Sequence, residues 1–257
     1  MQERQTSQLS TELDCRIQTN LAFGNTDLTA WLLEKLQLRR GERLLDVGCG
    51  TGKHLIPFAK AIGSEFACTG VDLSAESLAK AKESAQREGV KINFIQLNMD
   101  ELHPLDPSQQ YDTITAIYSA YYSNNVPQLL LNMTRVLKPG GRIVIMGPYA
   151  DNNKEWFDFL NQFMTLSQQV AKSSTTFMFD DILPFACSRF EHVKCYRFVN
   201  RVVIPSLDDL RNYWKSNIYY DEKLDESFER AAAEHFKHSN TFQFNKVALY
   251  AEMINPC

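Results

Sequence analysis

Three glycines at alternate positions, Gly48, Gly50 and Gly52, follow a short apolar segment that begins at Arg43. Apolar residues resume soon after them at helical spacing, so the glycines lie in a turn between a predicted strand and a predicted helix. Glycine has no Cβ, and its backbone can therefore adopt positive φ angles and approach a ligand closely. A strand, a glycine turn and a helix in this order are typical of the start of a phosphate- or nucleotide-binding fold.

The spacing of these glycines excludes two common nucleotide-binding motifs. A dinucleotide-binding fingerprint needs G-x-G-x-x-G, whereas the sequence reads G-C-G-T-G. A Walker A loop needs a glycine five positions before its Gly-Lys pair and a Ser or Thr after it, but Val47 and His54 occupy those positions. The turn is therefore predicted to bind a different kind of ligand.

The elements that must position this turn alternate along the chain. Predicted strands cover residues 43–47, 66–72, 92–98, 111–119 and 142–149, and predicted helices cover residues 26–38, 55–62, 75–89 and 126–141. Further helical segments follow, the first of them rich in aromatic residues, together with strands at 192–204 and 242–253. Strands that alternate with helices form a parallel sheet with helices on both faces. The sequence therefore predicts an α/β fold with a doubly wound, mostly parallel, seven-stranded sheet.

The segment D-V-G-C-G-T-G, from Asp46 to Gly52, resembles the first motif of class I S-adenosylmethionine-dependent methyltransferases. Two further motifs follow in that family's order: an acidic residue, Asp72, ends the second predicted strand, and the segment L-N-M-D-E-L follows the third. Several motifs in the correct order are more specific than one glycine turn. The resemblance covers residues 43–149 and implies a Rossmann-like methyltransferase fold that uses S-adenosyl-L-methionine.

The resemblance also implies a role for each motif residue. The glycines would pass against the methionine portion of the cofactor, and Asp46 would order the loop or reach the cofactor's amino group, directly or through water. Asp72 would accept hydrogen bonds from the ribose hydroxyls. Asp100 would bind the exocyclic amine of adenine, and Met99 would contact the ring. The expected cofactor-binding residues are Asp46, Gly48, Gly50, Gly52, Asp72, Leu73, Asn98, Met99, Asp100 and Tyr118.

Aromatic residues are expected to line the site of the methyl acceptor. Ligands of doubly wound sheets lie at the carboxyl ends of the strands, where the fourth and fifth predicted strands lead into tyrosines. The expected substrate-binding residues are Tyr121, Tyr122, Tyr149, Trp156 and Trp214. Trp156 and Trp214 would belong to a lid, although their helical spacing also suits an ordinary core. Such a pocket fits a small, aromatic or otherwise apolar metabolite, of the kind made in secondary metabolism.

The reaction expected from this resemblance is an in-line transfer of the sulfonium methyl to a nitrogen, oxygen or carbon nucleophile. Because the sulfonium is a good leaving group, positioning and exclusion of water can supply much of the rate. A neutral amine needs no base, whereas a hydroxyl or acidic carbon benefits from one. The candidates for a catalytic group are His54, for which a structural role is the alternative, and Tyr122.

Length and patterning suggest a single domain. With 257 residues, of which 44% are hydrophobic, the chain can bury one large core. Within it we expect a helical cap over residues 1–40 and a cofactor-binding core over 41–150. A helical insertion with lid segments is expected over 151–220, and a C-terminal helix and strand over 221–257.

Composition limits the partners. A formal net charge of −4 without a cluster of Lys or Arg argues against a nucleic-acid partner. The first twenty residues are polar, and no apolar run approaches the roughly 18 residues that span a bilayer, so we expect a cytoplasmic protein without a membrane partner. Six cysteines without a C-x-x-C pair predict neither a metal site nor disulfides. The partner is expected to be a small-molecule acceptor, and the protein a monomer or homodimer.

Two other functions remain open at this stage. The chain could methylate a protein or tRNA, with the region after Tyr149 as a docking surface, or it could be an inactive cofactor-binding partner subunit. The segment after the fourth predicted strand reads I-Y-S-A-Y-Y-S-N-N. This segment lacks the Asp/Asn-Pro-Pro-Tyr/Phe motif of adenine N-methyltransferases, which disfavours that substrate.

Overall fold

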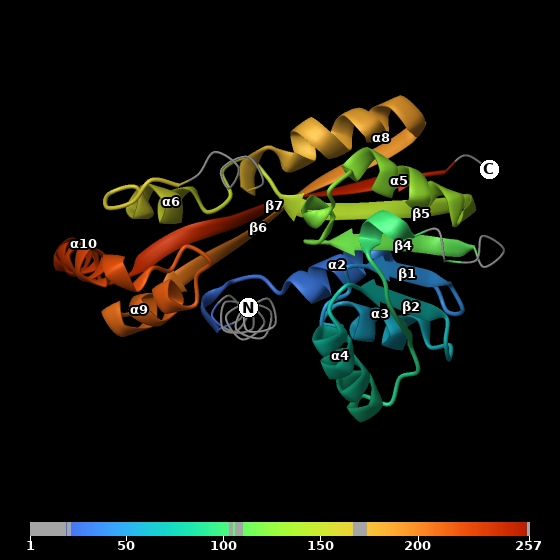
Figure 1. Ribbon diagram of the computed structural model, residues 1–257, viewed down its shortest axis with the longest axis horizontal. Helices are drawn as coiled ribbons and strands as arrows, with labels where there is room; N and C mark the ends of the chain where they lie inside the picture. Colours follow the sequence, from blue (N-terminus) through green and yellow to red (C-terminus); the bar gives the residue numbers. More distant parts are fainter. Residues whose placement is uncertain (1–18, 20–21, 103–104, 106–109, 167–173, 256–257) are drawn as a thin grey trace. The chain divides into compact units, whose positions relative to one another are not determined.

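A computed structural model describes residues 19, 22–102, 105, 110–166 and 174–255, which fall into two compact units (Figure 1). The core unit consists of the described residues of Thr29–Tyr149, Ser173–Phe198 and Ala248–Cys257, and the second unit of those of Met1–Leu28, Ala150–Lys172 and Val199–Val247. The expected insertion is thus divided between the two units. Residues 1–18 of the expected N-terminal cap lie outside the described residues.

Seven strands form one sheet in the order β3-β2-β1-β4-β5-β7-β6. The strands are β1 (Leu44–Val47), β2 (Cys68–Asp72), β3 (Asn93–Gln96), β4 (Tyr111–Ile117), β5 (Leu137–Pro148), β6 (His192–Ile204) and β7 (Phe242–Ile254). The first five strands pair in parallel, and β7 pairs antiparallel to β5. This arrangement confirms the predicted doubly wound, mostly parallel sheet.

Helices alternate with the strands along most of the chain. The α-helices are α2 (Leu28–Leu36), α3 (Leu55–Ile62), α4 (Ala75–Arg87), α5 (Val126–Arg135), α6 (Lys154–Leu160), α8 (Leu183–Arg189), α9 (Leu207–Lys215) and α10 (Asp225–His238). Short turns of helix are η1 (Met99–Glu101), η2 (Ala120–Tyr122), η3 (Met178–Ile182, a π-helix) and η4 (Glu222–Leu224). Within the described ranges, no helix combines the length and the apolar character needed to cross a membrane.

The predicted boundary between α5 and β5 is wrong. The helix expected over 126–141 ends at Arg135, and Leu137 already pairs with Tyr111 in the sheet. Pro139 lacks the N–H that a helix interior requires, and Gly140 has a positive φ of 70°. Both residues therefore belong to the irregular start of β5 rather than to the end of α5.

The two faces of the sheet in the core unit pack against different helices (Figure 1). Apolar residues of α5, η3 and α8 join Leu45 and Val47 of β1 in one buried cluster. On the other face, a Cβ added to Gly70 of β2 would lie 2.6 Å from Cδ2 of Leu55 in α3. Gly70 is the register partner of Asp46, and paired residues point to the same face. The side chain of Asp46 is therefore enclosed on the α3 side.

Candidate functional site

The turn after β1 is built from three glycines with left-handed backbone, whose φ angles are 74°, 53° and 79° at Gly48, Gly50 and Gly52. A Cβ on Gly48 would lie 2.4 Å from Cβ of Ser119, and one on Gly52 would lie 3.1 Å from Cδ1 of Ile56. A Cβ on Gly50 would meet nothing within 4 Å. Gly48 and Gly52 are thus enclosed by protein, whereas Gly50 borders open space in which a ligand can lie against the backbone.

The Asp72 carboxylate fixes the open side of this turn. Its Oδ2 accepts a hydrogen bond from the Gly50 amide at 2.7 Å, and its Oδ1 accepts one from the Ser74 amide at 2.9 Å. A carboxylate offers about four lone-pair sites, so it can still accept the hydroxyls of a cis-diol. The next residue, Leu73, is 66% exposed and presents an apolar surface. These features fit a nucleoside, since its ribose needs acceptors and its base needs an apolar contact.

The segment after β3 lies against the same turn. The Cε atom of Met99 would be 3.4 Å from a Cβ on Gly48, so the structure brings Met99 to the glycines. Asn98 accepts a hydrogen bond from the Asp100 amide at 3.0 Å and thereby caps η1. The Asp100 carboxylate accepts hydrogen bonds from the Ser123 hydroxyl and from the amide and side chain of Asn124, at 3.0 and 3.1 Å.

These donors control the charge of Asp100. Burial by itself raises its pKa, but the hydrogen bonds from Ser123 and Asn124 hold the pKa below its ordinary value. The carboxylate is therefore ionised, and it ties η1 to the loop after η2. An adenine amine at this position would have to share a carboxylate that already accepts three hydrogen bonds.

Asp46 lies beneath the turn and is only 4% exposed. Its Oδ1 accepts a hydrogen bond from the Thr115 hydroxyl at 2.6 Å. Burial raises the pKa of Asp46 to about 7 against the Thr115 hydrogen bond, which lowers it, and the nearby charge of Asp72 adds to the increase. Of the two roles that the sequence left open, this burial favours ordering of the loop.

The segment after β4 is fixed to the end of β1. The Ser119 hydroxyl donates to the Val47 carbonyl at 2.6 Å, and the Tyr118 amide donates to the Met146 carbonyl at 2.8 Å. Tyr118 has a φ of 54°, an uncommon value for a residue other than glycine. Burial raises the pKa of its phenol, which therefore stays neutral. Sequence analysis did not single out Ser119 or Thr115, two small polar residues in and after an apolar strand.

The expected acceptor residues of the core unit lie at the ends of β4 and β5. Tyr121 and Tyr122 are neighbours on η2, with ring centroids 4.6 Å apart. Tyr121 packs edge-on against Phe177 at 5.8 Å, whereas Tyr122 is 72% exposed. Tyr149, directly after β5, packs against the same apolar cluster as Tyr121. Tyr122 therefore has the ring that is most accessible to a ligand among these three.

His54 precedes α3, close in sequence to the turn. Its Nδ1 lies 2.9 Å from the Thr29 hydroxyl, and its ring stacks on Phe58 with centroids 6.4 Å apart. These contacts suit the structural alternative given for this residue. A role as general base stays a prediction for His54 as for Tyr122.

Trp156 and Trp214 lie in the aromatic core of the second unit rather than at an open surface. They are 1% and 0% exposed. Trp156 packs edge-on against Tyr213 at 4.9 Å, and Trp214 stacks on Phe228 at 5.3 Å and donates its indole N–H to Asp225 at 2.8 Å. Helical spacing cannot distinguish a lid from a core, and here both indoles are core residues. We no longer include them among the acceptor-binding residues.

The chain is similar in sequence to known methyltransferases. A family model described as a methyltransferase domain matches residues 38–231 of the chain. A nocamycin O-methyltransferase from Saccharothrix syringae is 35% identical over 127 residues, which are 49% of this chain and 45% of that protein. The chain spans about half the length of the curated relatives it matches.

Solved structures share the fold at low sequence identity. The YcgJ protein of Bacillus subtilis superposes with a TM-score of 0.60 at 18% identity, covering 89% of this chain and 98% of that one. An S-adenosylmethionine-dependent methyltransferase from Thiobacillus denitrificans, solved in complex with S-adenosyl-L-homocysteine, gives a TM-score of 0.51 at 20% identity, covering 88% of this chain and 90% of that one. These likenesses confirm the predicted Rossmann-like methyltransferase fold.

Proposed function

Because the chain belongs to the methyltransferase-domain family, we propose that it is an S-adenosyl-L-methionine-dependent methyltransferase acting on a small metabolite. The acceptor offers a nitrogen, oxygen or carbon nucleophile and is aromatic or otherwise apolar. The natural-product methyltransferase among the relatives supports a role in secondary metabolism. The chain spans about half the length of these relatives, so the activity of the whole protein is also proposed here.

One observation carries the cofactor assignment: Gly50 has an open side, and its amide donates to the Asp72 carboxylate, which the exposed Leu73 follows in the chain. The Gly50 backbone would lie against the methionine portion, and Asp72 would accept the ribose hydroxyls. Leu73 and Met99 would contact the adenine. When bound, the cofactor supplies a methyl group on a positively charged sulfur that is ready to leave.

The remaining residues of the site position the acceptor and keep water away. Tyr121 packs against Phe177, while the exposed Tyr122 and the half-buried Tyr149 lie after the carboxyl ends of β4 and β5. Such rings bind a flat apolar acceptor and orient its nucleophile. The phenol of Tyr118 is neutral, so it acts by hydrogen bonding and shape rather than as a base.

The proposal is tested with labelled cofactor. The purified protein is incubated with S-adenosyl-L-methionine carrying a radioactive methyl group and with a cell extract that contains metabolites, protein and RNA. We expect label in the small-molecule fraction. Label in protein or tRNA would replace this proposal by the macromolecular alternative. Cofactor binding without any transferred label would favour an inactive partner subunit.

Asp72→Asn is expected to weaken binding of S-adenosyl-L-homocysteine by about 1.5–3 kcal/mol, or roughly tenfold to a hundredfold. The amide removes the charge that strengthens the ribose hydrogen bonds and leaves one oxygen to serve the Gly50 and Ser74 amides. Titration calorimetry measures the affinity, which we expect in the micromolar range for the unchanged protein. Asp151→Asn, a substitution outside this site, is the control. If both variants bind S-adenosyl-L-homocysteine with equal affinity, Asp72 does not belong to the cofactor site.

Tyr122→Ala is expected to lower kcat/KM for the labelled acceptor about tenfold, since an aromatic contact contributes roughly 1.5 kcal/mol. Cofactor affinity should stay unchanged, because the ring is exposed at the acceptor side. Tyr122→Phe separates the ring from the hydroxyl. A Phe variant as slow as the Ala variant would assign the hydroxyl to catalysis, whereas unchanged turnover in both variants would exclude Tyr122 from the acceptor site.

A further inference from the structure

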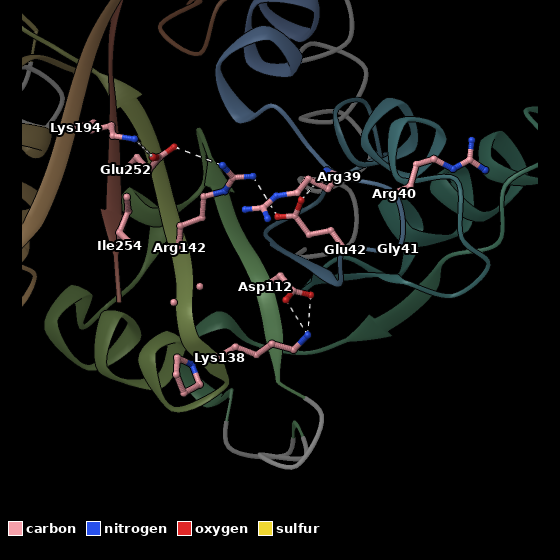
Figure 2. Close-up of a pocket in the computed structure, with 13 residues that line it drawn as sticks. Arg39, Arg40, Gly41, Glu42, Asp112, Lys138, Arg142, Lys194, Glu252 and Ile254 are labelled. Atoms are coloured by element: carbon pink, nitrogen blue, oxygen red, sulfur yellow. Dashed lines mark hydrogen bonds and ion pairs between the residues drawn. The ribbon is translucent and has the colours of Figure 1, made fainter. Parts of the chain in front are cut away.

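A polar cavity of about 560 Å³ lies in the core unit, at the amino-terminal ends of the parallel strands (Figure 2). It is formed by the loop before β1, the starts of β4 and β5, the end of β7 and Lys194 of β6. The glycine turn follows the carboxyl end of β1, so the cavity and the turn lie at opposite ends of the strands. The proposed methyltransferase function does not use it.

Five cationic side chains line this cavity with three carboxylates. The cations are Arg39, Arg40, Lys138, Arg142 and Lys194, and the carboxylates are Glu42, Asp112 and Glu252. The lining therefore carries two more positive than negative charges. Whether these charges can hold a ligand depends on which of them already have partners.

Glu42 and Asp112 each accept three hydrogen bonds from neighbouring groups. Glu42 accepts hydrogen bonds from the Arg142 guanidinium at 3.2 Å, from the Arg39 amide at 2.8 Å and from the Thr113 hydroxyl. Both oxygens of Asp112 lie 2.8 Å from Nζ of Lys138, and one also accepts from a backbone amide. Each carboxylate thus already has a cationic partner, Arg142 for Glu42 and Lys138 for Asp112.

Glu252 is occupied as well. It accepts from Nζ of Lys194 at 3.3 Å and from the Tyr250 hydroxyl at 2.9 Å, and the Arg142 guanidinium lies 3.9 Å away. The side chains of Glu42 and Glu252 are 8% and 6% exposed, so these two carboxylates are mostly removed from water, whereas Lys194 is 55% exposed. The three carboxylates are thus neutralised by Arg142, Lys138 and Lys194, and the two excess charges belong to Arg39 and Arg40.

The Arg39 guanidinium is the charged group of this cavity that is available to a ligand. Its guanidinium makes no hydrogen bond or ion pair with the described residues, and Figure 2 shows it projecting toward Arg142. Arg40 points away from the other labelled side chains, and its Nη2 lies 3.6 Å from a Cβ built on Gly63. Arg39 therefore faces the cavity with guanidinium donors that no described residue occupies, beside a second guanidinium that Glu42 holds in place.

We propose that this cavity binds the phosphate group of a small phosphate monoester. A guanidinium presents its donors in a planar fork that matches phosphate oxygens, and the Arg39 guanidinium lies beside that of Arg142 (Figure 2). The volume falls within the roughly 300–1,000 Å³ of small-molecule sites, so there is room for the organic part of the ester as well as for the phosphate. Arg39 would contact the phosphate directly, and the ion pairs around Arg142 would keep the site rigid.

The test measures anion binding by titration calorimetry at constant ionic strength, with S-adenosyl-L-homocysteine present in excess. The probes are phenyl phosphate and inorganic phosphate, which distinguish an ester site from a site for the free ion, and benzyl alcohol is the uncharged control. We expect phenyl phosphate to bind more tightly than inorganic phosphate and benzyl alcohol not to bind. Arg39→Gln should weaken phenyl phosphate binding about tenfold, since it removes one charge-assisted contact.

Arg135→Gln removes the same charge from an exposed position on α5 outside the cavity and is the matched control. Equal binding to the Arg39 and Arg135 variants, or no binding of either phosphate, would overturn the proposal. Tighter binding of inorganic phosphate than of phenyl phosphate would restrict the site to the free ion and overturn the ester assignment. The titration is repeated without S-adenosyl-L-homocysteine, so that a failure of the cofactor proposal cannot be mistaken for a failure of this one.

Discussion

Gly50→Val is expected to abolish detectable binding of S-adenosyl-L-homocysteine, a loss of at least about 3 kcal/mol or more than a hundredfold in affinity. The branched side chain would fill the open space beside the turn, where a Cβ meets no protein atom within 4 Å. The valine methyl groups would therefore clash with the bound cofactor and not with a neighbouring side chain. Titration calorimetry on the folded variant measures the effect.

The matched control is Gly89→Val at the end of α4. Gly89 has a φ of 68° and, like Gly50, would place a Cβ within 4 Å of nothing. Each substitution forces a β-branched residue into left-handed backbone at a cost of about 1–3 kcal/mol in the free energy of unfolding. Only the Gly50 variant should also lose the cofactor. If both variants bind as the unchanged protein does, the open side of Gly50 is not the cofactor cradle.

Periodicity predicted the fold well, because β1, β2 and β4 are short buried segments. The strand over 192–204 was predicted with its observed bounds. The end of α5 was missed, since Pro139 and two glycines look like a helix stop in the sequence, whereas Leu137 already forms a sheet pair. Pairing with a distant strand depends on tertiary structure, which the local spacing of apolar residues does not determine.

The site was predicted less completely than the fold. The spacing of the glycines identified the turn, but it could not show that Gly50 alone among the three has an open side, because Ser119 and Ile56 come from other parts of the chain. The sequence also could not decide whether Trp214 belongs to a lid or to a core, and the structure places it in a core, stacked on Phe228. Burial of an aromatic ring on a helix depends on which elements cover it, and helical spacing is the same in a lid and in a core.

Asp46→Asn is expected to make the protein's stability less sensitive to pH. The pKa of Asp46 is about 7 in the folded chain and near 3.8 when the chain is unfolded. Between these values the unfolded chain releases the proton that the folded chain retains, so stability falls as pH rises from about 4 to 7. Over the whole window this loss amounts to about 4 kcal/mol, and it is complete above the folded pKa.

Asparagine does not titrate, yet its oxygen can still accept the Thr115 hydroxyl that Asp46 accepts at 2.6 Å. The free energy of unfolding of the variant, minus that of the unchanged protein, should therefore increase by about 3 kcal/mol between pH 5 and pH 8, measured by urea unfolding without cofactor. Asp112→Asn is the control, and its difference from the unchanged protein should stay constant between pH 5 and pH 8, because Asp112 is ionised in both the folded and the unfolded chain over this range. Burial raises the pKa of Asp112, but hydrogen bonds and the charge of Lys138 outweigh it and leave the pKa lowered, so this carboxylate stabilises the fold above its unfolded pKa. Parallel pH curves for the Asp46 variant and the unchanged protein would show that this buried carboxyl group does not hold its proton.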